Sequence, residues 1–172
     1  IVVRNPVDRV LEQYAYYASK RGLKVSLQDW IERDYQIMQK VGLTNVSSDN
    51  DEDVAWYEYQ MQSQGGILGR SLYVIQIRHW IQAFRSIGRN PADSILIVRT
   101  DRLALDPDRE LARIQQFLNL TVSNITRYPL PKEITHQIRP VSASTRQLLE
   151  DLFRPYNRKL YRLLRRYGLF AG

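Results

Sequence analysis

Cysteine is absent from the sequence, and only two histidines occur among its 172 residues. Disulfide bonds, thiol nucleophiles and zinc sites built on thiolates are therefore excluded. His79 and His136 are too few for most histidine-based metal sites, so we expect no bound metal. Long apolar segments are also missing, since no run approaches the roughly 18 residues that a membrane-spanning helix needs. No secretory leader is visible at the N-terminus.

The remaining composition is typical of a globular domain, with 44% apolar, 25% charged and 10% aromatic residues. The formal net charge is +7. A basic surplus attracts anions such as a nucleotide, a sulfated glycan, nucleic acid or a lipid headgroup. On charge alone, a solvated basic surface is the simpler interpretation.

Periodicity and capping residues predict mainly helices. A β-branched strand over residues 1–3 is followed by Asn5-Pro6, which breaks the strand and suits a helix start. Apolar spacing predicts helices over 7–21, 27–41, 73–84, 107–118 and 145–167. The continuously apolar residues 94–98 are typical of a strand buried on both faces. The acidic residues 47–53 are interpreted as an exposed loop, the glycine-containing residues 60–66 as a flexible stretch, and residues 121–145 as a long loop.

The alternation of strands and helices predicts an α/β layered domain with a parallel sheet. Two strands are too few for a stable parallel sheet, so we expect further strands before Ile1. The chain also opens inside an apolar run rather than at a methionine. We therefore expect residues 1–172 to form a single, N-terminally truncated domain.

The most informative segment is IVVRNPVDRVLEQY at residues 1–14. Arg4 follows the first strand, and ligands of parallel sheets bind at the carboxyl ends of the strands. Free amides at the start of the next helix attract anions, and a guanidinium matches phosphate oxygens. An alternative is that Arg4 only pairs with an acid such as Asp8. Spacing alone does not decide between a phosphate site and this structural pair.

This segment resembles the 3′-phosphate-binding motif of sulfotransferases that use 3′-phosphoadenosine 5′-phosphosulfate (PAPS), especially the heparan-sulfate-type and related bacterial families. In that motif an arginine before Asn-Pro and a serine on the following helix hold the 3′-phosphate of the cofactor. Arg4 matches the arginine, whereas Glu12 stands in place of the serine. A carboxylate facing a phosphate is repulsive, so Glu12 must turn away or be neutralised by Arg9 or Lys20, or the site binds the cofactor poorly.

Three further segments, in the same order as in the family, extend the resemblance. They are residues 69–84, where Leu72, Tyr73 and Trp80 match and Ser71 replaces a common glycine, residues 94–120, and residues 152–164. The resemblance implies a P-loop NTPase-like three-layer sandwich with a parallel sheet, of which this chain lacks the N-terminal strand and phosphate loop. It also implies transfer of a sulfuryl group from PAPS to a hydroxyl or amine.

The other candidate site residues are less specific. Arg139 could reach a cofactor phosphate, although an exposed structural arginine is the simpler interpretation. Arg70 and Tyr73 could face the acceptor or the cofactor, although Tyr73 also fits the apolar stripe of its helix. His136 is a weak candidate acid or base, and His79 is expected to pack beside the same stripe.

The resemblance places the loop that grips the phosphosulfate, and a Glu or His base, upstream of Ile1. No residue of this chain is therefore assigned as catalytic. The acceptor could be a glycan, a lipid or a small metabolite, and nucleic acid is not an expected partner. The alternative is a non-catalytic anion-binding or interaction domain that keeps the fold. A cytoplasmic location is favoured, whereas the Golgi lumen would require an N-terminal anchor.

Overall fold

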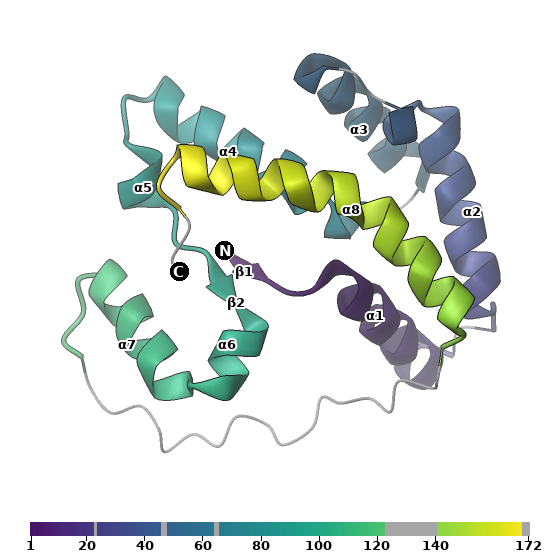
Figure 1. Cartoon of the computed structure of the whole chain (residues 1–172), viewed down its shortest axis with the longest axis horizontal. Coiled ribbons are helices and arrows are strands. Elements are labelled where there is room, and N and C mark those ends of the chain that lie inside the picture. Colours follow the sequence, from purple (N-terminus) through teal and green to yellow (C-terminus); the bar gives the residue numbers. More distant parts are fainter. Residues whose placement is uncertain (23, 46–47, 64–65, 123–140, 170–172) are drawn as a thin grey trace.

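The computed structural model describes residues 1–22, 24–45, 48–63, 66–122 and 141–169. Within these ranges the chain is mostly helical (Figure 1). The elements are β1 (Val2–Val3), α1 (Pro6–Lys20), α2 (Leu27–Lys40), η1 (Leu43–Asn45), α3 (Asp49–Ser63), η2 (Gly69–Ser71), α4 (Tyr73–Ser86), α5 (Pro91–Ser94), β2 (Val98–Arg99), α6 (Thr100–Leu105), α7 (Pro107–Phe117) and α8 (Ala143–Arg166).

The two strands pair in parallel, with Val2 opposite Val98 and Val3 opposite Arg99. This small parallel sheet among helices agrees with the predicted α/β class, while the three-layer sandwich remains a prediction. The second strand lies later than predicted, because residues 91–94 form α5 instead. Asn90 caps that helical turn through the amide of Ala92, and Pro91 occupies its first position, so Ser94 ends a helix rather than opening a strand.

The first two predicted helices agree with the structure within one residue at either end. The side chain of Asn5 accepts a hydrogen bond from the Val7 amide at 2.9 Å, and Pro6 occupies the first position of α1. Ser26 caps α2 by accepting from the Asp29 amide at 3.0 Å. Both starts therefore follow from local sequence, because a polar cap satisfies amides that have no partner within the helix.

The predictions of an exposed loop at residues 47–53 and of a flexible stretch at 60–66 were wrong where the structure describes a helix, at residues 49–53 and 60–63. Residues 47, 64 and 65 lie outside the described part of the chain. Helix α3 begins at Asp49, and the hydroxyl of Ser48 accepts from the Asp51 amide at 3.2 Å. Its acidic residues lie in the first turn, where the positive end of the helix dipole stabilises them. The helix continues to Ser63, and Gly66 is buried against neighbouring side chains.

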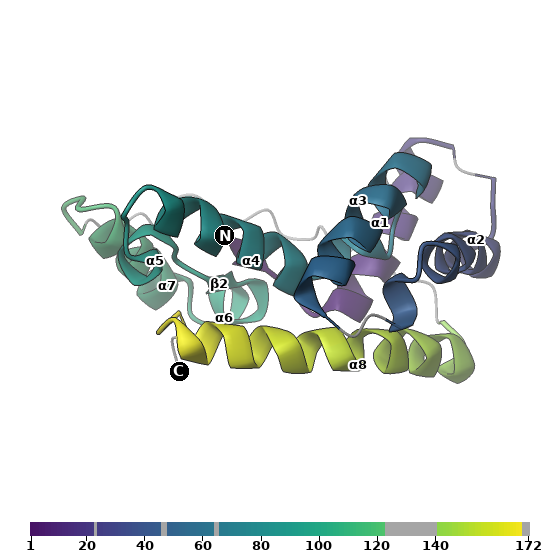
Figure 2. The same ribbon diagram turned by 90° about the horizontal axis from the view of Figure 1, so that it is seen from above.

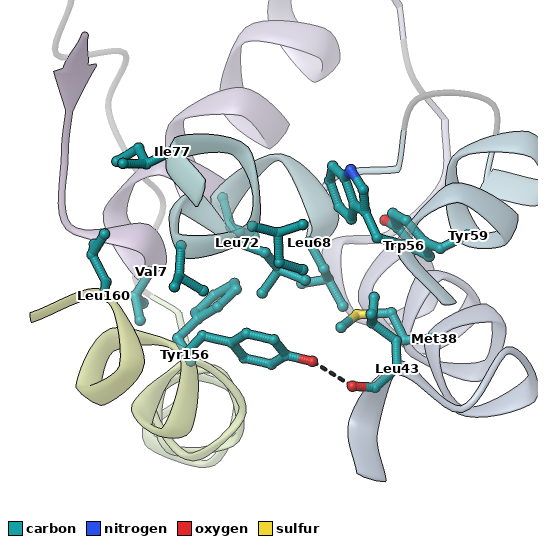
Figure 3. Packing of buried hydrophobic residues seen from close by; sticks show 14 of the residues in the cluster. Val7, Met38, Leu43, Trp56, Tyr59, Leu68, Leu72, Ile77, Tyr156 and Leu160 are labelled. Carbon is teal, nitrogen blue, oxygen red and sulfur yellow. Dashed lines mark hydrogen bonds between the residues drawn. The ribbon is translucent and has the colours of Figure 1, made fainter. Parts of the chain in front are cut away.

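Helix α8 lies along one side of the molecule and packs against α4 and α1 (Figures 1 and 2). Its buried side chains meet the core that the other helices form, and the hydroxyl of Tyr156 donates to the carbonyl of Leu43 (Figure 3). The buried face of α8 comprises Thr145, Leu149, Phe153, Tyr156, Leu160 and Leu164. The long helix therefore joins η1, which precedes α3, to the β1–α1 segment.

Two large apolar side chains lie outside the core. Leu148 is 41% exposed while its neighbour Leu149 is fully buried, so Leu149 and not Leu148 faces the core from this turn of α8. Trp80 is 55% exposed and lies with Phe84 along an apolar groove beside β2 and α7. His79 is exposed and contacts Asp53 at 2.9 Å rather than packing in the core. Among the residues described, no helix combines the length and apolar character needed to cross a membrane.

Candidate functional site

A cleft of about 780 Å³ lies where the two parallel strands end. Its walls come from the turn after β1, the residues after β2, helices α6 and α7, and one flank of α8. This is the carboxyl edge of the sheet, where parallel-sheet proteins bind ligands. The cleft is rich in cations, with Arg4, Arg99, Arg102, Arg109 and Arg113 in its lining.

Arg4 lies at the turn between β1 and α1, where its main chain is held by Tyr73. The amide of Arg4 donates to the Tyr73 hydroxyl at 3.4 Å. The amides of Val7 and Asp8, which open α1, are engaged by the side chain of Asn5. The guanidinium of Arg4, rather than these two helix amides, is therefore the group at this turn that can meet an anion.

Glu12 forms an ion pair with Arg4, joining Oε2 of the carboxylate to Nη1 of the guanidinium. The Arg4 side chain is 37% exposed and the Glu12 side chain 18%. The structure thus brings together the two residues that the motif predicts to be neighbours. The cation that neutralises Glu12 is Arg4 itself, not Arg9 or Lys20. Asp8, the alternative partner of Arg4, instead contacts Arg146 at 3.5 Å.

Tyr73 lies in the cleft and also packs against the core, so both interpretations of this residue apply. Burial raises the pKa of its phenol, while the hydrogen bond from the Arg4 amide and the charges of Arg9 and Arg4 act in the opposite direction. The phenol therefore stays protonated at neutral pH, and its oxygen accepts the hydrogen bond from the Arg4 amide through a lone pair.

Arg9 and Ser71 connect the start of α1 to η2 through hydrogen bonds. Arg9 donates from Nη1 to the Ser71 hydroxyl at 3.3 Å, and that hydroxyl donates to the Pro6 carbonyl at 3.4 Å. Burial, together with the nearby charge of Arg70, lowers the pKa of the Arg9 guanidinium. The serine that replaces the family glycine thus ties η2 to the start of α1.

The remaining predicted site residues do not join this arrangement. Arg70 is exposed and does not contribute to the cleft lining. Arg139 and His136 lie outside the residues that the structure describes. Of the two candidate acceptor-contacting residues, only Tyr73 faces the cleft.

The opposite wall of the cleft was missed by sequence reasoning. Arg99 pairs with Asp101 at 2.5 Å, and Arg113 pairs with Glu110 at 2.7 Å. Arg102 and Arg109 have no ion-pair partner within the described ranges. A signal was present, because Arg99 ends the second strand and Arg102 follows it closely, at the same edge of the sheet where Arg4 follows the first strand.

A buried clamp that holds the segment leading to Tyr73 was also missed. Asp34 accepts hydrogen bonds from the Tyr59 hydroxyl and from the Leu68 amide, both at 2.7 Å. The Tyr59 hydroxyl in turn accepts from the Gly69 amide at 3.0 Å. Burial raises the pKa of the Asp34 carboxyl, and these hydrogen bonds oppose that rise.

The clamp leaves room only for glycine at two positions. A Cβ atom on Gly66 would lie 2.0 Å from the Tyr59 hydroxyl oxygen, and one on Gly69 would lie 2.0 Å from Cε1 of Tyr59. Such distances are far below van der Waals contact. The glycines at 66 and 69 therefore allow the backbone to pass over Tyr59, which fixes the path from Gly66 to Tyr73.

The sequence of this chain is similar to those of known sulfotransferases. Residues 1–144 match the sulfotransferase domain family. Heparan sulfate glucosamine 3-O-sulfotransferase 6 of Homo sapiens is 27% identical over 185 aligned residues, which cover 95% of this chain and 46% of that protein. Heparan sulfate glucosamine 3-O-sulfotransferase 3B1 of Mus musculus is 26% identical and covers 95% of this chain and 40% of its own length.

A more distant relative is the membrane-associated sulfotransferase kil1 of Dictyostelium discoideum, which is 27% identical over 59% of this chain and 20% of that protein. The chain spans less than half the length of these curated relatives. No solved structure matches it. From the match over residues 1–144, we conclude that the chain belongs to the sulfotransferase domain family.

Proposed function

We propose that this chain forms the nucleotide side of a sulfotransferase site, which transfers a sulfuryl group from PAPS to a hydroxyl or amine. The observation that carries the proposal is Arg4, held at the carboxyl end of β1 in a cleft of about 780 Å³. A cleft of this size falls within the common range of roughly 300–1,000 Å³ for small-molecule sites. Membership of the family supports an enzyme of this kind.

Each part of the turn has a role in this proposal. Arg4 would hold the 3′-phosphate through its planar fork of donors, which matches phosphate oxygens. Tyr73 would keep the Arg4 main chain in place through its hydroxyl. PAPS, when bound, supplies the activated sulfuryl group. Positioning and charge stabilisation dominate such transfers, so a fixed arginine is the kind of group the reaction needs.

For the acceptor, we favour a glycan over a lipid or a small metabolite. Two of the relatives carry heparan sulfate in their names. Arg102 and Arg109, on the wall opposite Arg4, would suit an acceptor with acidic groups. No catalytic residue is assigned to this chain.

The second candidate is a non-catalytic anion-binding or interaction domain that retains the fold. The Arg4–Glu12 ion pair favours it, because Glu12 occupies the cation that a phosphate would need. The two candidates differ in turnover. Release of 3′,5′-adenosine bisphosphate from PAPS in the presence of heparan sulfate supports the enzyme, whereas nucleotide binding without release supports the second candidate.

The predictions of the partners and of the cellular compartment are kept as proposals. Nucleic acid is not an expected partner, and an affinity for duplex DNA that falls steeply with salt would contradict this view. The preference for the cytoplasm over the Golgi lumen remains a prediction, since one relative is named as membrane-associated.

The test is protection of the protein from thermal unfolding by 3′,5′-adenosine bisphosphate. A ligand at 100 times its Kd stabilises the native state by about 2.7 kcal/mol, which raises Tm by several degrees. We expect this rise in the wild type, no rise in Arg4→Ala, and an unchanged rise in Arg89→Ala, a control in an exposed turn outside the cleft. No rise in the wild type at millimolar nucleotide overturns the proposal, and so does a full rise in Arg4→Ala.

A further inference from the structure

The Arg4–Glu12 ion pair stands directly at the cleft. Arg4 belongs to the lining of the cleft, whereas Glu12 does not. The carboxylate is therefore set behind the guanidinium, and its lower exposure limits its freedom to turn into water. The main chain is fixed on both sides of the pair, since Tyr73 holds the amide of Arg4 and α1 carries Glu12 in its second turn.

An anion that reaches Arg4 therefore meets a cation that is already neutralised. A phosphate has to share Arg4 with Glu12 or displace it, and the two anions repel each other in a partly desolvated site. A second carboxylate, that of Asp8, also lines the cleft. Its contact with Arg146 at 3.5 Å leaves Arg4 as the cation paired with Glu12.

A sugar hydroxyl binds to the carboxylate of such a pair, whereas a phosphate binds to the guanidinium and is repelled by the carboxylate. In dinucleotide-binding folds an acid selects a ribose hydroxyl, while a nearby arginine accommodates a phosphate on the same sugar. Here one residue of each type is present, and they are bound to each other. The balance between them decides how strongly the site prefers a phosphorylated nucleotide.

We propose that Glu12 is a specificity-determining residue of the nucleotide subsite, where it competes with the 3′-phosphate for Arg4. It lowers the preference for nucleotides that carry a 3′-phosphate over those with a free 3′-hydroxyl. This inference rests on the proposed function, because it concerns the same site.

The experiment measures two affinities by calorimetry, for 3′,5′-adenosine bisphosphate and for adenosine 5′-monophosphate. The variant is Glu12→Gln, which removes the charge and keeps the shape. Its control is Glu58→Gln, which removes one charge from an exposed position on α3. Loss of a competing, partly buried charge is expected to tighten bisphosphate binding about tenfold. Monophosphate binding should change less than twofold, and Glu58→Gln should change neither.

A double-mutant cycle shows whether Glu12 acts through Arg4. The Arg4→Ala background is titrated at nucleotide concentrations well above those of the thermal test, so that its weakened binding can be measured. There, Glu12→Gln should leave the ratio of the two affinities unchanged, because no cation remains to be released. A shift of similar size in that background would mean that Glu12 acts through its general field, and it would overturn the inference. Glu12→Ser, which restores the residue type of the family motif, serves as a second variant if Glu12→Gln does not fold.

The remaining outcomes separate the two levels of the proposal. If the wild type binds the bisphosphate and Glu12→Gln binds it equally or more weakly, the role of Glu12 is overturned and the nucleotide site stands. If the wild type fails to bind it, the proposed function fails and this inference, which rests on it, falls with it.

Discussion

Two regions of the molecule use charge in opposite ways. Where α3, α4 and α8 meet, Glu52 is fully buried and contacts Arg78 at 2.8 Å and Lys159 at 2.7 Å. At the cleft, Arg4 and Glu12 form a pair that remains partly open to solvent. The first group joins three helices, whereas the second lies beside an open space.

The difference lies in what surrounds each charge. Arg78 also contacts Asp49 at 3.0 Å and pairs with Asp53, so its charge is balanced by carboxylates within the protein. Its buried Nε alone has no hydrogen-bond partner among the described residues. Arg102 and Arg109 find no such acids in the part of the chain that the structure describes. Buried charges that are paired with each other hold helices together, while unpaired arginines that line a cleft are available to a ligand. This contrast predicts which substitutions change stability and which change binding.

The largest effect is expected for Glu52→Ala. Removing the buried carboxylate takes away the group that Arg78 and Lys159 share, and breaking a buried ion pair in this way costs about 3–5 kcal/mol. Arg78 keeps its two aspartates, but Lys159 loses the carboxylate that it contacts. Urea denaturation followed by circular dichroism measures the free energy of unfolding.

Glu58→Ala is the matched control, because Glu58 lies on the same helix with its side chain exposed. Its free energy of unfolding should stay within about 0.5 kcal/mol of the wild type. A loss below 1 kcal/mol for Glu52→Ala would show that the network is not what holds α3 to α4 and α8.

A smaller effect, which depends on pH, is expected for Asp34→Asn. Burial raises the pKa of the Asp34 carboxyl in the folded state, so the folded state holds this proton more tightly than the unfolded state. Between the unfolded and folded pKa values, stability therefore falls as pH rises. Asparagine does not titrate, so the advantage of the wild type over Asp34→Asn should be largest near pH 4 and shrink as pH rises above it.

Urea denaturation of both proteins from pH 4 to pH 7 measures this difference. Comparing the two proteins cancels the titration of the other acids, which is common to both. An advantage that grows with pH would mean that the hydrogen bonds from Tyr59 and Leu68 outweigh burial, and it would contradict the raised pKa.

The sequence predicted the part of the cleft that depends on neighbouring residues. Arg4, Asn5 and Pro6 are consecutive, so a strand end, a cap and a helix start can be recognised together. Glu12 lies in the second turn of the helix that Pro6 starts, so its closeness to Arg4 can also be predicted from the motif. The opposite wall, with Arg102 and Arg109, required knowledge that β2 pairs with β1 in parallel.

The buried networks were not predictable, because their members are distant in sequence. Asp34 and Tyr59 are separated by 25 residues, and Glu52 and Lys159 by 107. Glu52 was interpreted as part of an exposed loop because acidic runs are usually solvated. Its burial depends on Arg78 and Lys159, which arrive from α4 and α8 only when the chain is folded. Tertiary contacts thus overrode the local pattern.

The smallest change in stability is expected at the cleft itself. Because the Arg4–Glu12 pair is partly exposed, its coupling energy should be no more than about 1 kcal/mol. Arg4→Ala, Glu12→Ala and the double variant, compared by urea denaturation, give this energy as a double-mutant cycle. A coupling of 3 kcal/mol or more would place the pair with Glu52 as part of the fold. A coupling below 1 kcal/mol leaves Arg4 free to exchange Glu12 for a ligand, because a phosphate then competes with a weak internal partner rather than with a structural one.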